Sequence, residues 1–94
     1  MNIVNVPGER KQHKVLLYTL STCAWCKRTK GFLKDNGIDY GYVDIDLCSD
    51  SDRRKIRKEI EKLGGELVYP SIIIDDKILI SGFVLDKIKE TLGI

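Results

Sequence analysis

The chain has 94 residues, the size of one small domain, and 43% of them are hydrophobic, which is enough for one modest core. Its net charge of +2 gives no basic field of the kind that nucleic-acid binding usually requires, so we expect no nucleic-acid partner. The apolar runs are too short to cross a bilayer, and the polar residues 1–14 contain no secretory h-region. These features predict a cytoplasmic protein without a membrane partner.

The first half of the chain predicts an extension followed by a strand, a helix and a second strand. Residues 1–13 contain proline, glycine and a run of charge, and we expect them to be a flexible extension to one domain over residues 14–94. Residues 15–20 are almost continuously apolar, as in a strand buried on both faces. A helix is expected from about residue 24 to residue 36, and residues 38–46 have the β-propensity of a second strand.

The second half predicts a helix, a hairpin and a last helix. Apolar residues recur at helical spacing over residues 49–63 and again over residues 85–92. Strands at 72–74 and 77–81 flank the Asp75-Asp76 dipeptide, a polar break typical of a tight hairpin. The order β-α-β-α-β-β-α predicts an α/β fold with a small four-stranded mixed sheet and helices on both faces. Long helices between the first three strands imply that these strands are parallel, and the final pair implies an antiparallel edge.

Cys23 and Cys26 form a C-x-x-C pair at the junction of the first expected strand and the first expected helix. A helix N-terminus presents unpaired N–H groups and a partial positive charge, which lower the pKa of a thiol placed there. Cys23 is therefore predicted to be the nucleophile of a disulfide exchange. Cys26, one helical turn further on, is predicted to resolve the mixed disulfide. Such a redox-active pair needs no separate cofactor.

Three segments resemble the glutaredoxin and NrdH-redoxin branch of the thioredoxin-fold family: YTLSTCAWC at 18–26, YPSIII at 69–74 and ISGFVLDKI at 80–88. The resemblance extends over residues 14–94. It implies a thioredoxin-like fold and a thiol–disulfide oxidoreductase that acts on protein or mixed disulfides. Pro70 matches the cis-proline that faces the cysteine pair in this family, and the backbone beside such a proline pairs with an incoming chain.

The residues around these motifs are the expected contacts of a disulfide-containing client protein. Trp25 can equally be an aromatic side chain that only packs on the first helical turn. Besides the catalytic Cys23 and Cys26, the predicted contact residues are Thr22, Trp25, Tyr69, Pro70, Ser71, Ser81, Gly82 and Phe83.

Two positions depart from the pattern of glutaredoxins that use glutathione. Those proteins usually carry a lysine three residues before the nucleophile, where this chain has Leu20, which cannot bind a glutathione carboxylate. They also tend to have paired glycines before the last helix, where this chain has a single glycine, Gly82. The resemblance thus implies a dithiol reductase that is poor with glutathione. Its electron donor would be a thioredoxin-reductase-type protein or another low-molecular-weight thiol, and we expect it to act as a monomer.

The same cysteines leave two metal-binding alternatives open. Cys23, Cys26, Cys48 and His13 have the donor atoms of a Cys₃His zinc site, although the chain has no second C-x-x-C. Some glutaredoxins share an iron–sulfur cluster between two chains, and such a cluster is the other alternative. A small metal chaperone is disfavoured because its elements follow the order β-α-β-β-α-β. Cys48 is interpreted either as a bystander or as a regulatory thiol.

Overall fold

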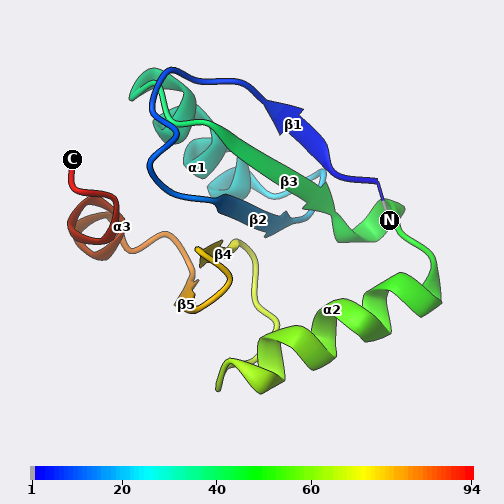
Figure 1. Cartoon of the computed structure of the whole chain (residues 1–94). Helices are drawn as coiled ribbons and strands as arrows, with labels where there is room; N and C mark the ends of the chain where they lie inside the picture. The colour runs from blue at the N-terminus through cyan, green and yellow to red at the C-terminus, as the bar shows by residue number, and fades with distance from the viewer. Residues whose placement is uncertain (1) are drawn as a thin grey trace.

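The computed structural model describes residues 2–94 as a five-stranded mixed sheet with helices on both faces (Figure 1). The strands lie in the order β1-β3-β2-β4-β5; β2 and β3 are parallel, and the other neighbouring pairs are antiparallel. The strands are β1 (Val4–Val6), β2 (Val15–Thr19), β3 (Tyr40–Asp44), β4 (Ser71–Ile74) and β5 (Ile78–Ser81). The helices are α1 (Ala24–Asp35), α2 (Asp50–Lys62) and α3 (Leu85–Leu92), with a 3₁₀ helix η1 (Ile45–Leu47) after β3. Within residues 2–94, no helix has both the length and the apolar character needed to cross a membrane.

Two hydrophobic clusters hold the helices on opposite faces of the sheet, because consecutive residues of a strand point to opposite sides. Leu17 of β2 packs in a cluster with Leu33 of α1 and Ile88 of α3. The next residue, Tyr18, packs in the other cluster with Ile56 of α2. Complete burial of an aliphatic side chain of this size is worth about 1.5–3 kcal/mol. The predicted α/β fold with helices on both faces is therefore confirmed.

The sheet has five strands rather than the expected four, because β1 forms within residues 1–13, the expected extension. The strand pairs antiparallel with β3, with Val4 opposite Tyr42. Gly41 makes room for this pairing, since a Cβ at that position would lie 2.9 Å from Cγ2 of Ile3. A strand of three residues is too short to show an alternating pattern, so the sequence did not reveal it.

β4 runs antiparallel to β2, which corrects the expectation that the first three long strands are parallel. Ser71, the first residue of β4, pairs with Tyr18 near the carboxyl end of β2. The chain leaves that end of the sheet through α2, and residues 63–70 then return it to the same end (Figure 1). The return path replaces a simple crossover and brings Pro70 to the sheet end where β2 finishes.

Candidate active site

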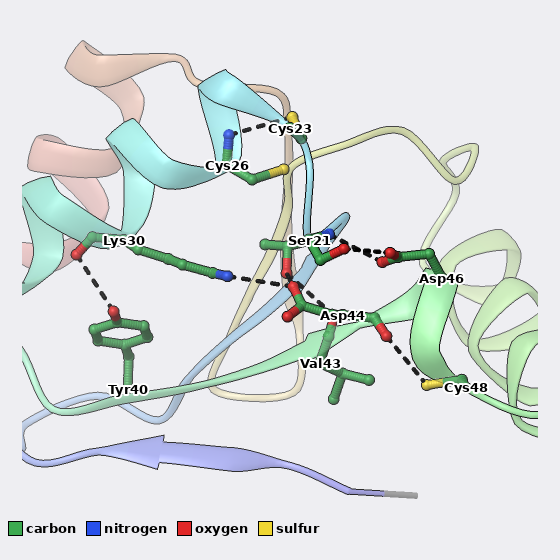
Figure 2. Close-up of polar contacts among 10 residues, drawn as sticks. Ser21, Cys23, Cys26, Lys30, Tyr40, Val43, Asp44, Asp46 and Cys48 are labelled. Atoms are coloured by element: carbon green, nitrogen blue, oxygen red, sulfur yellow. Dashed lines mark hydrogen bonds and ion pairs between the residues drawn. The ribbon is translucent and has the colours of Figure 1, made fainter.

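Cys23 is the N-cap of α1 and follows the turn at the end of β2 (Figure 2). Its backbone is extended, and its sulfur accepts a hydrogen bond from the backbone N–H of Cys26 at 3.3 Å. An N-cap position usually carries a side-chain oxygen that accepts this bond, and here a sulfur takes that place. A thiolate is a better acceptor than a thiol, so both the cap and the helix dipole favour the charged form of Cys23.

The two thiols have opposite pKa shifts. A hydrogen bond from the Cys26 thiol is the main cause that lowers the pKa of Cys23. Burial is the next-largest effect and opposes it, and the backbone N–H groups of Cys26 and Trp25 lower the pKa further by smaller amounts. Burial raises the pKa of Cys26 to about 11, and its hydrogen bond to Cys23 acts in the same direction. Cys26 has no exposed surface, whereas Cys23 is half-buried. When the pair ionises, the negative charge therefore forms first on the accessible sulfur.

A carboxylate fixes the turn before Cys23. Asp46 of η1 accepts a hydrogen bond from the backbone N–H of Ser21 at 2.9 Å and a second one from the Ser21 hydroxyl (Figure 2). The carbonyl of Leu20 accepts the N–H of Cys23 at 3.2 Å, which closes the turn. The hydrogen bonds from Ser21 also lower the pKa of Asp46, so its carboxylate is the form that binds the turn. The position of Cys23 thus depends on the segment after β3 as well as on β2.

A half-buried ion pair lies below the cysteines. Nζ of Lys30 on α1 is 3.2 Å from Oδ1 of Asp44, the last residue of β3, and the two side chains are only 20% and 17% exposed (Figure 2). Asp44 also accepts the hydroxyl of Thr19 at 2.7 Å. The ammonium group lies 3.8 Å from the centre of the Tyr42 ring. Asp44 and Tyr42 of β3 therefore contact Lys30 directly. Thr19 of β2 holds Asp44 in place.

The sequence assigned no role to Lys30, Asp44 or Asp46. Lys30 comes four residues after Cys26, which places both side chains on one helix face, and this spacing was a signal that could have found it. Asp44 ends β3 and Asp46 follows it, at the end of the sheet where the cysteine pair begins. Polar residues at the end of a strand are usually solvated, so their type alone did not indicate contacts with the site.

The Tyr69–Pro70 peptide bond is cis, as the family resemblance implies. The carbonyl of Pro70 accepts the backbone N–H of Gly82 at 2.7 Å, so the loop before β4 is tied to the segment after β5. Gly82 has a φ of +85°, in the left-handed region that favours glycine. Within residues 2–94, no backbone hydrogen bond uses the N–H or the carbonyl of Tyr69. This leaves the backbone beside the cis-proline available to another chain.

A pocket of about 210 Å³ lies between the first turn of α1 and the cis-proline loop. The Trp25 ring is centred 6.0 Å from the Phe83 ring, and Trp25 is 54% exposed, so these two aromatic rings form an accessible apolar wall. The structure thus brings together five of the residues that the sequence predicts as client contacts. They are Trp25, Tyr69, Pro70, Gly82 and Phe83.

Thr22, Ser71 and Ser81 do not line this pocket. Ser71 has no exposed surface, and its hydroxyl donates a hydrogen bond to the carbonyl of Val68. Ser81 is exposed at the end of β5, opposite Ser71 in the strand pairing. Thr22 is exposed in the turn before Cys23. Contact of these three residues with a client stays a prediction.

The candidate zinc ligands are not gathered in the structure. The Cys48 thiol donates to the carbonyl of Asp44 at 3.6 Å, and Nδ1 of His13 lies 2.7 Å from Oδ2 of Asp75, before the start of β2. In the part of the chain from residue 2 onward, no three or more His, Cys, Asp or Glu side chains are grouped so that they could hold a metal ion. The described cysteines are instead three free thiols, with Cys23 and Cys26 adjacent at the start of α1.

Comparisons with known proteins identify the family of the chain. The family model for glutaredoxin matches residues 15–79. An uncharacterised glutaredoxin-like 8.6 kDa protein in the rubredoxin operon of Clostridium pasteurianum is 35% identical over 79 residues, which cover 81% of this chain and 97% of that protein.

Solved structures with the same fold include the glutaredoxin of Methanosarcina mazei Go1, with a TM-score of 0.86 and 36% identity over 98% of this chain and 88% of that one. The methanoredoxin of Methanosarcina acetivorans has a TM-score of 0.78 and 37% identity over 86% of this chain and 85% of that one. These matches confirm the expected thioredoxin-like fold. The chain belongs to the glutaredoxin family and is a thiol–disulfide oxidoreductase.

Proposed function

We propose that this oxidoreductase is a dithiol reductase of protein or mixed disulfides, with Cys23 as the nucleophile and Cys26 as the resolving thiol. The observation that carries the proposal is the contrast between the two sulfurs. Cys23 is accessible at the N-terminus of α1 and its pKa is lowered, whereas Cys26 is buried and its pKa is raised to about 11. Because the thiolate is the attacking form, the exchange begins at Cys23.

Two exchanges complete the proposed reduction. The Cys23 thiolate attacks one sulfur of the client disulfide, and the other client sulfur leaves as a thiolate. Cys26 then loses its proton and attacks Cys23, which forms the Cys23–Cys26 disulfide and releases the second client sulfur as a thiolate. The client gains two electrons and takes up two protons, and the cysteine pair loses those two electrons as its disulfide forms. A donor thiol or reductase restores the pair by the reverse exchanges.

The pocket beside the cysteines supports docking of an extended client segment. Trp25 and Phe83 offer an apolar wall for a client side chain. The unpaired N–H and carbonyl of Tyr69, next to the cis-proline, can hydrogen-bond with a client backbone in the manner of an added strand. Such backbone contacts accept many sequences, which suits a reductase of several disulfide-containing clients.

Leu20 supports weak use of glutathione. It stands three residues before Cys23, its side chain is half-buried and apolar, and it offers no charge to a carboxylate. We therefore propose that a thioredoxin-reductase-type protein or another low-molecular-weight thiol returns the electrons. A cytoplasmic location, where thiols are kept reduced, fits this direction of electron flow.

A donor comparison tests this proposal. Reduction of a mixed disulfide is followed with glutathione and its reductase, with a thioredoxin-reductase system, and with a small dithiol as donor. We expect slow turnover with glutathione and faster turnover in Leu20→Lys, because the lysine supplies a charge for the glutathione carboxylate. Leu47→Lys, at a leucine that is 76% exposed, is the matched control and should leave turnover unchanged.

The two parts of the proposal fail in different ways. If the unmodified protein turned over as fast with glutathione as with the thioredoxin-reductase system, the proposed choice of electron donor would be refuted. Turnover that survives Cys23→Ser with any donor would refute the dithiol mechanism itself.

A further inference from the structure

The resolving step makes a demand that the cysteine pair alone does not meet. Cys26 must lose its proton before it attacks, yet its side chain is completely buried, and burial disfavours a charged sulfur. Resting on the roles proposed above for Cys23 and Cys26, we propose that Lys30 is a positioning residue for resolution, whose fixed ammonium group favours the Cys26 thiolate.

The geometry places Lys30 for this task. It follows Cys26 by four residues on α1, so the two side chains lie on one helix face, one turn apart. The Lys30 side chain runs from the helix toward Asp44 below the cysteines, rather than out to solvent (Figure 2). A lysine usually extends its ammonium group into water, and this one is only 20% exposed. Solvent and salt therefore screen its charge less than that of a surface lysine.

The Lys30 charge acts on both sulfurs. The hydrogen bond from Cys26 is the main cause that lowers the pKa of Cys23, and the Lys30 charge lowers this pKa further. Against the dominant effect of burial, it lowers the pKa of Cys26. In the reduced enzyme the charge of Cys23 opposes ionisation of Cys26. That opposition ends when Cys23 enters a mixed disulfide, and from then on the ammonium group acts on Cys26 alone.

Asp44 limits the strength of this effect, because its carboxylate lies 3.2 Å from the ammonium group. The carboxylate is itself anchored by the hydroxyl of Thr19. Removal of either charge leaves the other half-buried and unpaired, so both changes should lower stability. Their effects on Cys26 should differ in sign, since one change removes a cation and the other removes an anion. This difference separates an electrostatic role from a merely structural one.

The titratable and charged groups around Lys30 determine the pH dependence of the resolving step. They are Cys23 and Cys26 at the start of α1, Asp44 and Tyr42 on β3, and Tyr40, whose hydroxyl donates to the carbonyl of Lys30 at 3.3 Å.

The test is a stopped-flow reaction of the reduced protein with the aromatic disulfide dithiobis(nitrobenzoate) at a series of pH values. Attack by Cys23 releases the first thionitrobenzoate, and resolution by Cys26 releases the second in a unimolecular phase. Lys30→Gln should slow the second phase about threefold to tenfold at neutral pH, which corresponds to an upward shift of its pH midpoint by about half a unit to one unit. Asp44→Asn should shift the midpoint downward. Lys30→Arg keeps the positive charge and should keep the midpoint of the unmodified protein.

Two further variants guard against loss of folding and against nonspecific charge effects. The double variant Lys30→Gln/Asp44→Asn keeps a neutral hydrogen-bonded pair, and its midpoint should lie between those of the single variants. Lys34→Gln removes an exposed cation from the same helix and should behave like the unmodified protein. Thermal unfolding of every variant records its stability separately.

The possible results distinguish the role of Lys30 from the roles of the two cysteines. An unchanged midpoint in Lys30→Gln, or shifts of the same sign in Lys30→Gln and Asp44→Asn, would overturn the role of Lys30 and leave the cysteine roles standing. Release of a second equivalent from Cys26→Ser would overturn the resolving role of Cys26, and the role of Lys30 with it.

Discussion

The backbone N–H of Gly82 donates a hydrogen bond of 2.7 Å to the carbonyl oxygen of Pro70. This bond joins the cis-proline loop to the segment before α3, and both segments line the pocket beside Trp25. The bond therefore links two of the segments that form the proposed client site. The bond depends on a backbone conformation at Gly82, with φ at +85°, that other residues rarely adopt.

Replacement of two glycines should change stability in opposite directions. A Cβ at Gly82 would touch nothing within 4 Å, so Gly82→Ala should cost about 1 kcal/mol through its positive φ alone and should raise KM for protein disulfides. Gly31 also has free space around it, but it lies inside α1, where alanine should add about 0.5–1 kcal/mol. Urea unfolding of both variants measures the difference, and equal shifts would contradict the backbone account of Gly82.

Trp25→Ala should weaken client binding more than chemistry. The exposed ring forms one wall of the pocket with Phe83, and its loss removes apolar contact area without opening a core cavity. We expect KM for a protein disulfide to rise about tenfold, equivalent to about 1.4 kcal/mol, with kcat nearly unchanged. Ile78→Ala, at a 40% exposed residue on the edge strand β5, is the control and should leave KM unaffected. A fall in kcat alone would assign Trp25 to the chemistry instead.

The pH dependence of alkylation should report the unequal thiols. Cys23 should react with iodoacetamide with a midpoint below the ordinary thiol value of about 8.5, because the hydrogen bond from Cys26 stabilises its thiolate. Cys26→Ala removes that bond and should move the midpoint upward. The measurement uses a Cys48→Ser background so that Cys48 is not labelled. A midpoint of Cys23 that is unchanged by Cys26→Ala would show that another group stabilises the thiolate.

The turn between β4 and β5 should make stability depend on pH in acid. The hydrogen bond with His13 is the main cause that lowers the pKa of Asp75, and the backbone N–H of Lys14 adds to it. A lowered folded-state pKa stabilises the fold above the unfolded value of about 3.9, and this stabilisation is lost as pH falls through the folded value. Asp75→Asn tolerates the φ of 56° and should be less stable at neutral pH.

The difference between Asp75→Asn and the unmodified protein should disappear in strong acid, where both side chains are neutral. Urea midpoints across the acid range measure it. Asp76→Asn is the control, since the Asp76–Lys14 pair is two-thirds exposed and screened by solvent, and should show a smaller effect. A constant difference between Asp75→Asn and the unmodified protein at all pH values would contradict the linkage.

The main elements of the fold were predictable because their signals are local. The apolar run that became β2, the helical spacing of Ile56 and Ile60, and the Asp75-Asp76 break each reflect the conformation of a few adjacent residues. The direction of β4 was not predictable, because it depends on the path of residues 63–70, which carry no regular pattern. β1 was missed because three residues gain their strand conformation only from pairing with β3.

The residues of the candidate site also differ in how far the sequence predicts them. Cys23 and Cys26 follow from a short motif, and the cis form of Pro70 could be expected only from the family resemblance, since most X-Pro bonds are trans. The contacts of Lys30 with Asp44 and of Asp46 with Ser21 join segments far apart in sequence. The residue types alone do not reveal such contacts. Such contacts are decided by tertiary packing.

Capture of a mixed disulfide tests the order of the two thiols most directly. Cys26→Ser and Cys23→Ser, each in a Cys48→Ser background, are mixed with a disulfide-containing protein, and the products are weighed by mass spectrometry. Cys26→Ser should accumulate a stable adduct on Cys23, because no second thiol is present to resolve it. Cys23→Ser should form none, because Cys26 is buried and its pKa is raised to about 11. An adduct on Cys26 in Cys23→Ser, with none on Cys23 in Cys26→Ser, would contradict the proposed mechanism.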